Sequence, residues 1–265
     1  MRITIVTPTL NQAEFLPETL ASVRRAAANA PALEVEHIVR DGGSDDGTLE
    51  ILAAQEFASW VSEPDGGQSV AINKGLAAAS GEILAYLCSD DLLEPDALAL
   101  VHQRFRERPE AEFVYGDYFF LESDSGWKRA KQAGEFSLAR LHRHNFLSQP
   151  ATYWRASVVA RHGLLDESLK FCMDHEFWLR ASADTRWSYL REPLATMRLH
   201  ADAKTSAAIS AMWWESARMQ RRYGHGWRPY FEALRMALYG QHYYRLKRRY
   251  FRWLGRRRAD RGAHS

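Results

Sequence analysis

GEILAYLCSDDLLEPDAL, residues 81–98, is the stretch around which the rest of the chain is arranged. An apolar run that begins at Ile83 is short enough for a buried strand, and it stops at Ser89. Two adjacent carboxylates, Asp90 and Asp91, follow at once. Ligands of open α/β sheets bind beyond the carboxyl ends of the strands, so acids at this point can hold a divalent cation and, through it, phosphate oxygens. The alternative is an ordinary turn in which the acids cap the next helix.

Strands and helices alternate along the first part of the chain. Strands are expected at 2–7, 34–40, 58–62 and 83–87, and helices at 17–30, from 48 onward, at 69–79 and at 96–107. Pro8 and Thr9 are expected in the turn after the first strand. This alternation predicts an α/β fold with a mostly parallel sheet and helices on both faces.

Polar side chains lie at the end of each expected strand. They are Thr7, Thr9, Asn11, Asp41, Asp65 and Asp90. Each one alone is more typical of a turn, but four strands that end alike indicate one ligand site at one edge of the sheet. A dinucleotide cofactor is disfavoured because no G-x-G-x-x-G follows a strand, and the phosphate-binding G-x-x-x-x-G-K-[ST] is also absent from the sequence.

Length and composition indicate one sizeable α/β domain with an appendage, since the chain has 265 residues and 46% hydrophobic content. No apolar run approaches the roughly 18 residues of a membrane span, and the first residues lack the features of a signal peptide. We therefore expect a cytoplasmic chain. Cys88 and Cys172 lie far apart in apolar contexts, so neither a disulfide nor a cysteine metal ligand is expected.

Charge is divided unevenly along the chain. From Arg218 onward there are 14 Lys or Arg and two acids, which leaves 21 basic and 31 acidic residues in 1–217, so the tail carries about +12 and the body −10. Aromatic and basic residues interleave over 227–258, a composition that favours the surface of an anionic membrane and thus a peripheral location on its inner face. Docking on the acidic body or on a second protomer, as a homo-oligomer, and a disordered end are the alternatives.

Taken together, the motifs resemble those of family 2 glycosyltransferases over roughly residues 1–206. The matching segments are VTPTLNQ at 6–12, VRDGGSDDGT at 39–48, EPDGGQSVAINKG at 63–75, LCSDD at 87–91, FLSQPATYWRASVVARHGLLDESL at 146–169, FCMDHEFWLR at 171–180 and MRLHADAKTS at 197–206. Each motif is weakly specific alone, whereas their shared order and spacing are strong support. The resemblance implies a GT-A domain over 1–210 and a helical, basic and aromatic extension over 211–265.

The activity that this resemblance implies is an inverting transfer of a sugar from a nucleotide diphosphate donor, UDP-sugar by default, to a hydroxyl group. The acceptor would be a glycan or a lipid-linked molecule in surface polysaccharide or glycolipid synthesis, and the enzyme a metal-dependent hexosyltransferase. The donor site implied for this chain consists of Thr7, Pro8, Thr9, Asn11, Asp41, Asp65, Lys74 and Asp90, with Asp41 on the base or ribose.

The metal site implied by the resemblance holds Mg²⁺ or Mn²⁺. Asp91 is expected as a direct ligand, and His200 is expected near the metal or the diphosphate, although a lone histidine is more often structural. Cys88 stands where the family has its first acid, so one carboxylate is missing. Hard cations prefer oxygen to sulfur, and a low metal affinity is expected.

The proton acceptor implied by the resemblance is Asp174, with Glu176 as the second candidate. An inverting displacement needs a carboxylate that takes the proton of the attacking hydroxyl. The alternative is that Asp174 is only the N-cap of a helix over 176–183. Asp117 and Gln149 are expected to line the acceptor side.

Two other functions remain to be weighed. A nucleic-acid-binding protein could use the basic tail, but the predicted cleft is acidic and would repel a polyanion, so no nucleic acid is expected. A nucleotidyltransferase of the same fold would need a basic triphosphate loop after the first strand, and TPTLNQ contains no basic residue.

Overall fold

The structure is a computed structural model that describes residues 1–123, 125–200 and 208–238. It contains two compact units. The first consists of Met1–Phe119, Ala130–Ser168 and Met173–Met197. The second consists of Phe120–Arg129, Leu169–Cys172 and the chain from Arg198 onward. The domain boundary expected near residue 210 stays a prediction.

The strands form one sheet in the order β3-β2-β1-β4-β8-β6-β9-β5, and β7 pairs with β6. The strands are β1 (Arg2–Thr9), β2 (Glu34–Asp41), β3 (Ser59–Ser62), β4 (Ile83–Tyr86), β5 (Leu92–Leu93), β6 (Phe113–Glu122), β7 (Trp127–Lys131), β8 (Thr152–Arg155) and β9 (Trp187–Leu199). The helices are α1 (Leu16–Ala28), α2 (Thr48–Ala53), α3 (Gln68–Ala78), α4 (Ala97–Glu107), α5 (Leu138–Leu141), the 3-10 turn η1 (Gln149–Ala151), α6 (Ala156–His162), α7 (Met173–Ala181) and α9 (Ile209–Arg222). Residues 228–238 are also helical.

The predicted α/β architecture is confirmed. Strands β1 to β4 pair in parallel through β1–β2, β1–β4 and β2–β3, as the alternating pattern indicated. The later strands extend this sheet with antiparallel pairs, including β4–β8 and β6–β8. Strand β4 therefore lies between the parallel and antiparallel parts of the sheet. Asp90 and Asp91, which follow this strand, lie at the boundary between the two parts.

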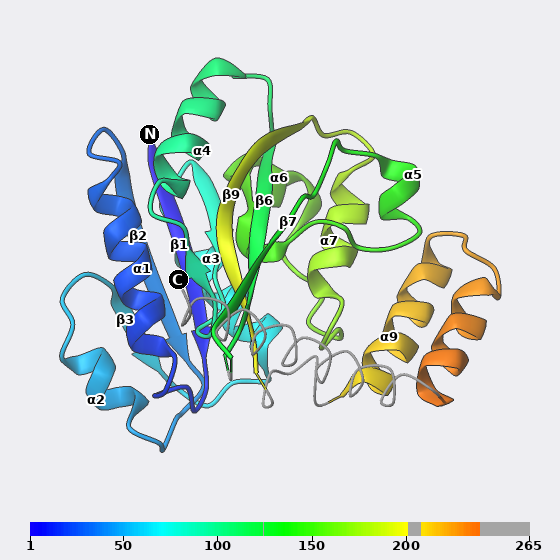
Figure 1. Ribbon diagram of the computed structural model, residues 1–265, viewed down its shortest axis with the longest axis horizontal. Helices are drawn as coiled ribbons and strands as arrows, with labels where there is room; N and C mark the ends of the chain where they lie inside the picture. The colour runs from blue at the N-terminus through cyan, green and yellow to red at the C-terminus, as the bar shows by residue number, and fades with distance from the viewer. Residues whose placement is uncertain (124, 201–207, 239–265) are drawn as a thin grey trace, which may run out of the picture. The chain divides into compact units, whose positions relative to one another are not determined.

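Helices cover both faces of the parallel strands. Leu16 of α1 and Leu52 of α2 pack with Val39 of β2 on one face (Figure 1). Helix α3 packs on the opposite face, where a Cβ on Gly75 would lie 2.3 Å from a methyl group of Val6. Only glycine allows this close approach, and it brings the N-terminus of α3 toward the end of β4.

One boundary differs from the prediction, because β1 continues through Pro8 and Thr9 instead of turning at them. The Thr9 carbonyl accepts a hydrogen bond from Gly42 on the β2 side, whereas the Val6 carbonyl accepts one from Leu87 on the β4 side. Alternate residues face alternate neighbours, so Pro8 faces β4 beyond the last paired residue of that strand. The missing N–H of proline removes no hydrogen bond there.

A second boundary concerns Asp174, which was weighed as the N-cap of a helix over 176–183. The helix α7 begins at Met173, so Asp174 lies inside its first turn. Acidic residues are favoured both at the N-cap and in the first turn, and the residue type alone does not separate the two placements.

Candidate functional site

The end of β2 is organised by the carboxylate of Asp41. One of its oxygens accepts from the backbone N–H groups of Gly43 and Ser44, both at 3.0 Å, and from the hydroxyl of Ser62 at 2.6 Å. The other accepts from the Ser44 hydroxyl. Burial opposes ionisation, but the hydrogen bonds from Ser44, Ser62 and Gly43 outweigh it and lower the pKa of Asp41. A charged carboxylate is thus fixed at this edge of the sheet.

The loop after β1 is joined to the loop after β2 by hydrogen bonds around Asn11. Its backbone N–H donates to the Ser44 hydroxyl at 2.7 Å, and its side-chain oxygen accepts from the backbone of Asp45 at 2.9 Å. Asn11 has φ of 52°, the left-handed region that asparagine tolerates better than most residues. Asn11 and Asp41, predicted as donor-site residues, are therefore brought together.

The threonines of β1 differ in their surroundings. Thr7 is fully buried, and its hydroxyl lies 2.9 Å from Nε2 of His37, whose pKa burial lowers to about 4. A direct contact of the Thr7 side chain with a ligand would require this pair to open. The hydroxyl of Thr9 is also buried, and it has no hydrogen-bond partner among the described residues. A buried hydroxyl without a partner is costly, which makes Thr9 the better candidate to meet a ligand.

A chain of contacts leads from this donor side to the acids after β4. The Asp65 carboxylate lies 3.2 Å from where a Cβ of Gly42 would be, and it accepts from the N–H of Gly67 at 2.7 Å. The next residue, Gln68, donates from its side chain to Sγ of Cys88 at 3.2 Å. The segments after β2, β3 and β4 thus contact one another in sequence along one edge of the sheet.

Lys74, another predicted donor residue, lies further along α3. Its ammonium group is paired with Glu63 at 2.7 Å, and both side chains are partly exposed. Exposed pairs of this kind are weak, so a diphosphate could compete with Glu63 for the lysine. The donor role of Lys74 stays a prediction.

The carboxylates of the acids after β4 lie close to the sulfur atom of Cys88. Cys88, Asp90 and Asp91 each offer a ligand atom, and these atoms lie within 4.8 Å of one another. The segment folds into a tight turn in which the N–H of Asp91 donates to the carbonyl of Cys88 at 3.0 Å, and this turn brings residues three apart together. Ligands of one cation lie at most about 4–5 Å apart, so the group fits a divalent ion. The expectation that Cys88 is not itself a metal ligand stays a prediction.

Helix α1 holds this turn in place from the other side. The Thr19 hydroxyl lies 2.8 Å from the carbonyl of Ser89 and 2.9 Å from that of Asp91, and the Ser22 hydroxyl accepts from the N–H of Leu93 at 3.1 Å. Thr19 and Ser22 are fully buried, and Asp91 is 7% exposed. The Asp91 carboxylate therefore stands on a turn whose backbone is fixed.

Asp174 is carried by a helix that is set in an aromatic core. Phe177 and Trp178 of α7 are almost fully buried, and the Trp178 ring meets that of Phe113 edge-to-face with 5.6 Å between centroids. The side chain of Asn145 donates to the Asp174 carboxylate at 2.9 Å. A rigid helix and a hydrogen bond together define the orientation of this carboxyl group.

The last residue of β4 connects Asp174 with the metal-binding group. Tyr86 is 2% exposed, and burial raises the pKa of its phenol, which the negative charges of Asp174, Cys88 and Asp91 raise further. Charges exert such an effect at short range. The charges of the predicted base and of the predicted metal ligands therefore act on the same phenol, although these residues are more than 80 residues apart in sequence.

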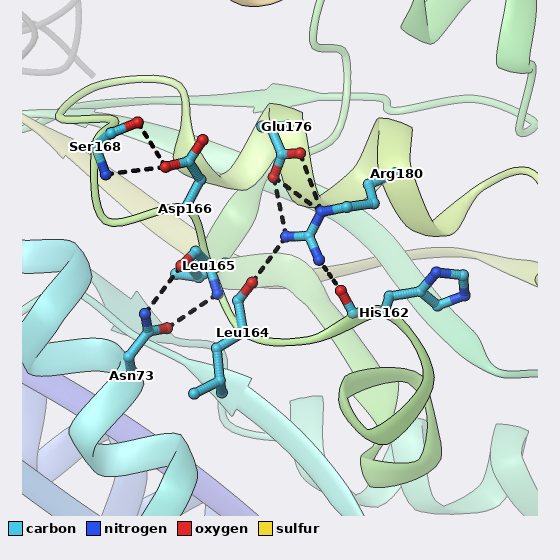
Figure 2. Close-up of polar contacts among 8 residues, drawn as sticks. All are labelled: Asn73, His162, Leu164, Leu165, Asp166, Ser168, Glu176 and Arg180. Carbon is cyan, nitrogen blue, oxygen red and sulfur yellow. Dashed lines mark hydrogen bonds and ion pairs between the residues drawn. The ribbon is translucent and has the colours of Figure 1, made fainter.

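Glu176, the second predicted base, points toward Arg180 (Figure 2). Its carboxylate pairs with the Arg180 guanidinium at 3.0 Å, and Arg180 also donates to the carbonyls of His162 and Leu164. From α3, Asn73 forms two hydrogen bonds with the backbone of Leu165, at 2.9 and 3.0 Å. Glu176 thus helps to hold the loop 162–168, and a role as proton acceptor would require the pair with Arg180 to open.

Gln149, predicted on the acceptor side, touches the metal-binding group. Its amide nitrogen donates to the carbonyl of Tyr86, and its oxygen lies 3.7 Å from Sγ of Cys88. Asp117 accepts from the N–H of Ala133 at 2.9 Å and from the Tyr189 hydroxyl. Burial and this bond raise the pKa of Tyr189 to about 12. Asp117 therefore joins β6 to β9 and the chain after β7.

His200 lies directly after β9 in the second compact unit, where it is 6% exposed. Its predicted approach to the metal stays a prediction. Gln68 and Asn145 are the site residues that sequence reasoning missed. Gln68 falls inside the segment 63–75, which resembles the family, and this was a usable signal. Asn145 precedes the matching segment 146–169 by one residue, so no motif pointed to it.

Comparison with known proteins identifies the family. Residues 4–186 match Glycosyl transferase family 2. The chain belongs to this family. The glycosyltransferase "Rv1514c" of Mycobacterium tuberculosis, named as uncharacterized, is 33% identical over 184 residues, which cover 68% of each chain. A "PGL/p-HBAD biosynthesis glycosyltransferase" of Mycobacterium bovis is 32% identical over 184 residues, 66% of this chain and 68% of that protein.

Solved structures of glycosyltransferases share the fold of this family 2 chain. The TarS fragment 1–349 of S. aureus in complex with UDP-GlcNAc superposes with a TM-score of 0.67 and 18% identity, over 83% of this chain and 65% of that one. The mannosyltransferase PcManGT from Pyrobaculum calidifontis, in complex with GDP-Man and Mn²⁺, gives a TM-score of 0.59 and 17% identity over 88% and 64%. The GT-A fold expected from the sequence is confirmed.

Proposed function

We propose that this family 2 glycosyltransferase moves a sugar from a nucleotide diphosphate donor to a hydroxyl group of a lipid-linked or glycan acceptor, with inversion. The proposal is carried by the cluster of Cys88, Asp90 and Asp91 after β4, together with the charge of Asp174, which acts on the same Tyr86 phenol as the charges of Cys88 and Asp91. The contacts from Asp41 through Asp65 to Cys88 extend the same edge to the donor side.

On the donor side, Asp41 and the buried hydroxyl of Thr9 would hold the nucleoside. The Asp41 carboxylate is ionised and fixed, and it would accept from a base N–H or from ribose hydroxyls in place of one of its present donors, such as the Ser62 hydroxyl. The complexes of TarS with UDP-GlcNAc and of PcManGT with GDP-Man support a nucleotide-sugar donor. UDP is our first choice of carrier.

Cys88, Asp90 and Asp91 would hold a divalent cation, whose positive charge would offset the charge that grows on the departing diphosphate. We expect Mn²⁺ to be preferred, because Mg²⁺ demands near-ideal octahedral geometry, which a set containing sulfur does not offer.

In the transfer itself, Asp174 would act as the general base. The acceptor oxygen forms a bond to the anomeric carbon as its proton passes to the Asp174 carboxylate. The bond between that carbon and the diphosphate oxygen breaks on the opposite side, and the electron pair leaves with the diphosphate, so the configuration inverts. Asn145 would keep the carboxylate oriented toward the acceptor.

A lipid-linked acceptor is supported by the relative named for PGL/p-HBAD biosynthesis and by an apolar stripe near the C-terminus. Trp227, Phe231, Leu234 and Leu238 recur at helical spacing and are between 48% and 70% exposed. No helix among the described residues is both long and apolar enough to cross a membrane. We propose that this stripe and the basic residues up to 258, which lie outside the described residues, bind an anionic membrane surface peripherally.

The donor site can be tested by calorimetric titration of UDP, GDP and dTDP, each with and without Mn²⁺. We expect one of the three to bind, and Mn²⁺ to tighten its binding by at least about tenfold, a difference of about 1.4 kcal/mol. If none of the three binds under either condition, the proposed activity is wrong.

The membrane surface can be tested with the double variant Trp227→Ser, Phe231→Ser. Each aromatic side chain contributes roughly 1.5–3 kcal/mol when it is fully buried, so sedimentation with phosphatidylglycerol vesicles should weaken by about tenfold or more. Trp60→Ser is the matched control, because Trp60 is also an exposed aromatic, at 38%, but belongs to β3. Equal sedimentation of the double variant and the wild type would refute the membrane proposal.

A further inference from the structure

A buried glutamate on α9 forms hydrogen bonds with the backbone just before α7, the helix that carries the proposed base. Glu215 is 8% exposed, and its carboxylate accepts the backbone N–H groups of Lys170 at 2.9 Å, Phe171 at 2.7 Å and Cys172 at 2.9 Å. One turn earlier on α9, the Met212 carbonyl lies 3.8 Å from Sγ of Cys172. We name residues 170–172 the strap.

The strap is joined directly to the proposed catalytic helix. Helix α7 begins at Met173, the next residue, and Asp174 follows it. A carboxylate that accepts three consecutive N–H groups forms charge-assisted hydrogen bonds, which are shorter and stronger than neutral ones. It also satisfies backbone donors that otherwise have to find partners at the start of a helix. One charged side chain therefore binds three consecutive N–H groups of the strap.

The chain before the strap is held by different residues. Asn73 and the pair of Glu176 with Arg180 grip the loop 162–168 (Figure 2). The proposed reaction requires the Asp174 carboxylate to lie within hydrogen-bond distance of the acceptor hydroxyl. A displacement of about 1 Å can lower the rate by about 10²-fold.

We propose that Glu215 is a positioning residue for the transfer reaction. Through the strap it sets where α7 begins, and thereby where the Asp174 carboxylate stands. Glu215 touches neither donor nor acceptor in this proposal. The inference rests on the proposed function, in which Asp174 is the base.

The test compares Glu215→Gln with wild type in steady-state transfer and in calorimetric titration of the nucleotide with Mn²⁺. Glutamine keeps one acceptor oxygen but turns an N–H group toward the strap, so kcat should fall by about tenfold to a hundredfold. Donor KM and nucleotide affinity should stay within about twofold. Glu232→Gln is the matched control, since Glu232 lies in the same part of the chain but forms an exposed pair with Arg235, and it should leave all three values unchanged.

A cycle with Asp174→Asn separates positioning from general stability. If Glu215 acts through Asp174, then Glu215→Gln should cost less than about twofold further once Asp174→Asn is present. An equal cost in both backgrounds, or a parallel loss of donor affinity and kcat, overturns the proposal. If Glu215→Gln does not fold, Glu215→Asp, which retains the charge on a shorter side chain, serves in its place, and it should lower kcat and the protection of the strap in amide hydrogen exchange together. Unchanged kcat with lost strap protection overturns the proposal.

The outcome can be told apart from failure of the proposed function. If the wild-type chain binds no nucleotide and transfers no sugar, the proposed function has failed and Glu215 is not at issue. If the wild type is active and Glu215→Gln has unchanged kcat, only the positioning role is refuted.

Discussion

Asp174→Asn is expected to lower kcat by about 10²- to 10⁴-fold and to leave the affinity for the nucleotide and Mn²⁺ unchanged. The asparagine side chain has nearly the same shape and can still meet Asn145, but it cannot take the proton of the acceptor hydroxyl. The donor contacts come from other elements, around Asp41 and after β4. Initial rates of sugar transfer, together with calorimetric titration of the nucleotide, measure the two quantities separately.

Glu176→Gln is the informative contrast to this variant. It removes the charge that pairs with Arg180 in a largely buried setting, and breaking a buried pair destabilises a protein by about 3–5 kcal/mol. We therefore expect a lower midpoint of thermal unfolding with a smaller loss of kcat. The base would have to be reassigned to Glu176 if Asp174→Asn kept its turnover while Glu176→Gln lost turnover without losing stability.

Asp91→Asn is expected to weaken nucleotide binding in the presence of Mn²⁺ by about 10²-fold, and to have little effect in its absence. Asp91 is buried on a turn that Thr19 fixes, and its loss leaves Asp90 as the one carboxylate of the group. Asp45→Asn is the matched control, because Asp45 is an exposed acid on the donor side and loses the same charge. Titrations of the nucleotide at several Mn²⁺ concentrations compare the two variants.

Cys88→Asp is expected to have the opposite effect in the same titrations, namely tighter binding of the cation. A third carboxylate in a group whose ligand atoms already lie within 4.8 Å should tighten binding of Mg²⁺ and Mn²⁺. A wild-type response to Mn²⁺ in Asp91→Asn would exclude this group as the cation site, whatever Cys88→Asp shows.

Much of the fold could be predicted because the signals for it are local. The apolar run before Ser89 and the alternation of strand and helix indicated β1 to β4 and the helices between them. Boundaries were less certain, as Pro8 illustrates. A proline usually ends a strand, and only the pairing partner on each side of β1 shows that its missing N–H is harmless.

The partners of the site residues could not be predicted in the same way. Asn145 and Asp174 are 29 residues apart, and Glu215 lies 43 to 45 residues beyond the strap that it binds. No periodicity or motif connects residues at such separations. Asn145 and Glu215 are ordinary polar residues in sequence, and they acquire a role only from the side chain or backbone that folding brings to them.

What the sequence by itself determined was the order of the elements and the set of acids that follow the strands, because apolar periodicity and turn chemistry act within a few residues. The tertiary structure alone decided how those acids are used. Asn145 reached the carboxylate of Asp174, Gln68 came within hydrogen-bond distance of Sγ of Cys88, and Glu215 reached the strap before α7. Hydrogen bonds and ion pairs act over a few ångströms in space, and distance along the chain does not predict which groups come that close.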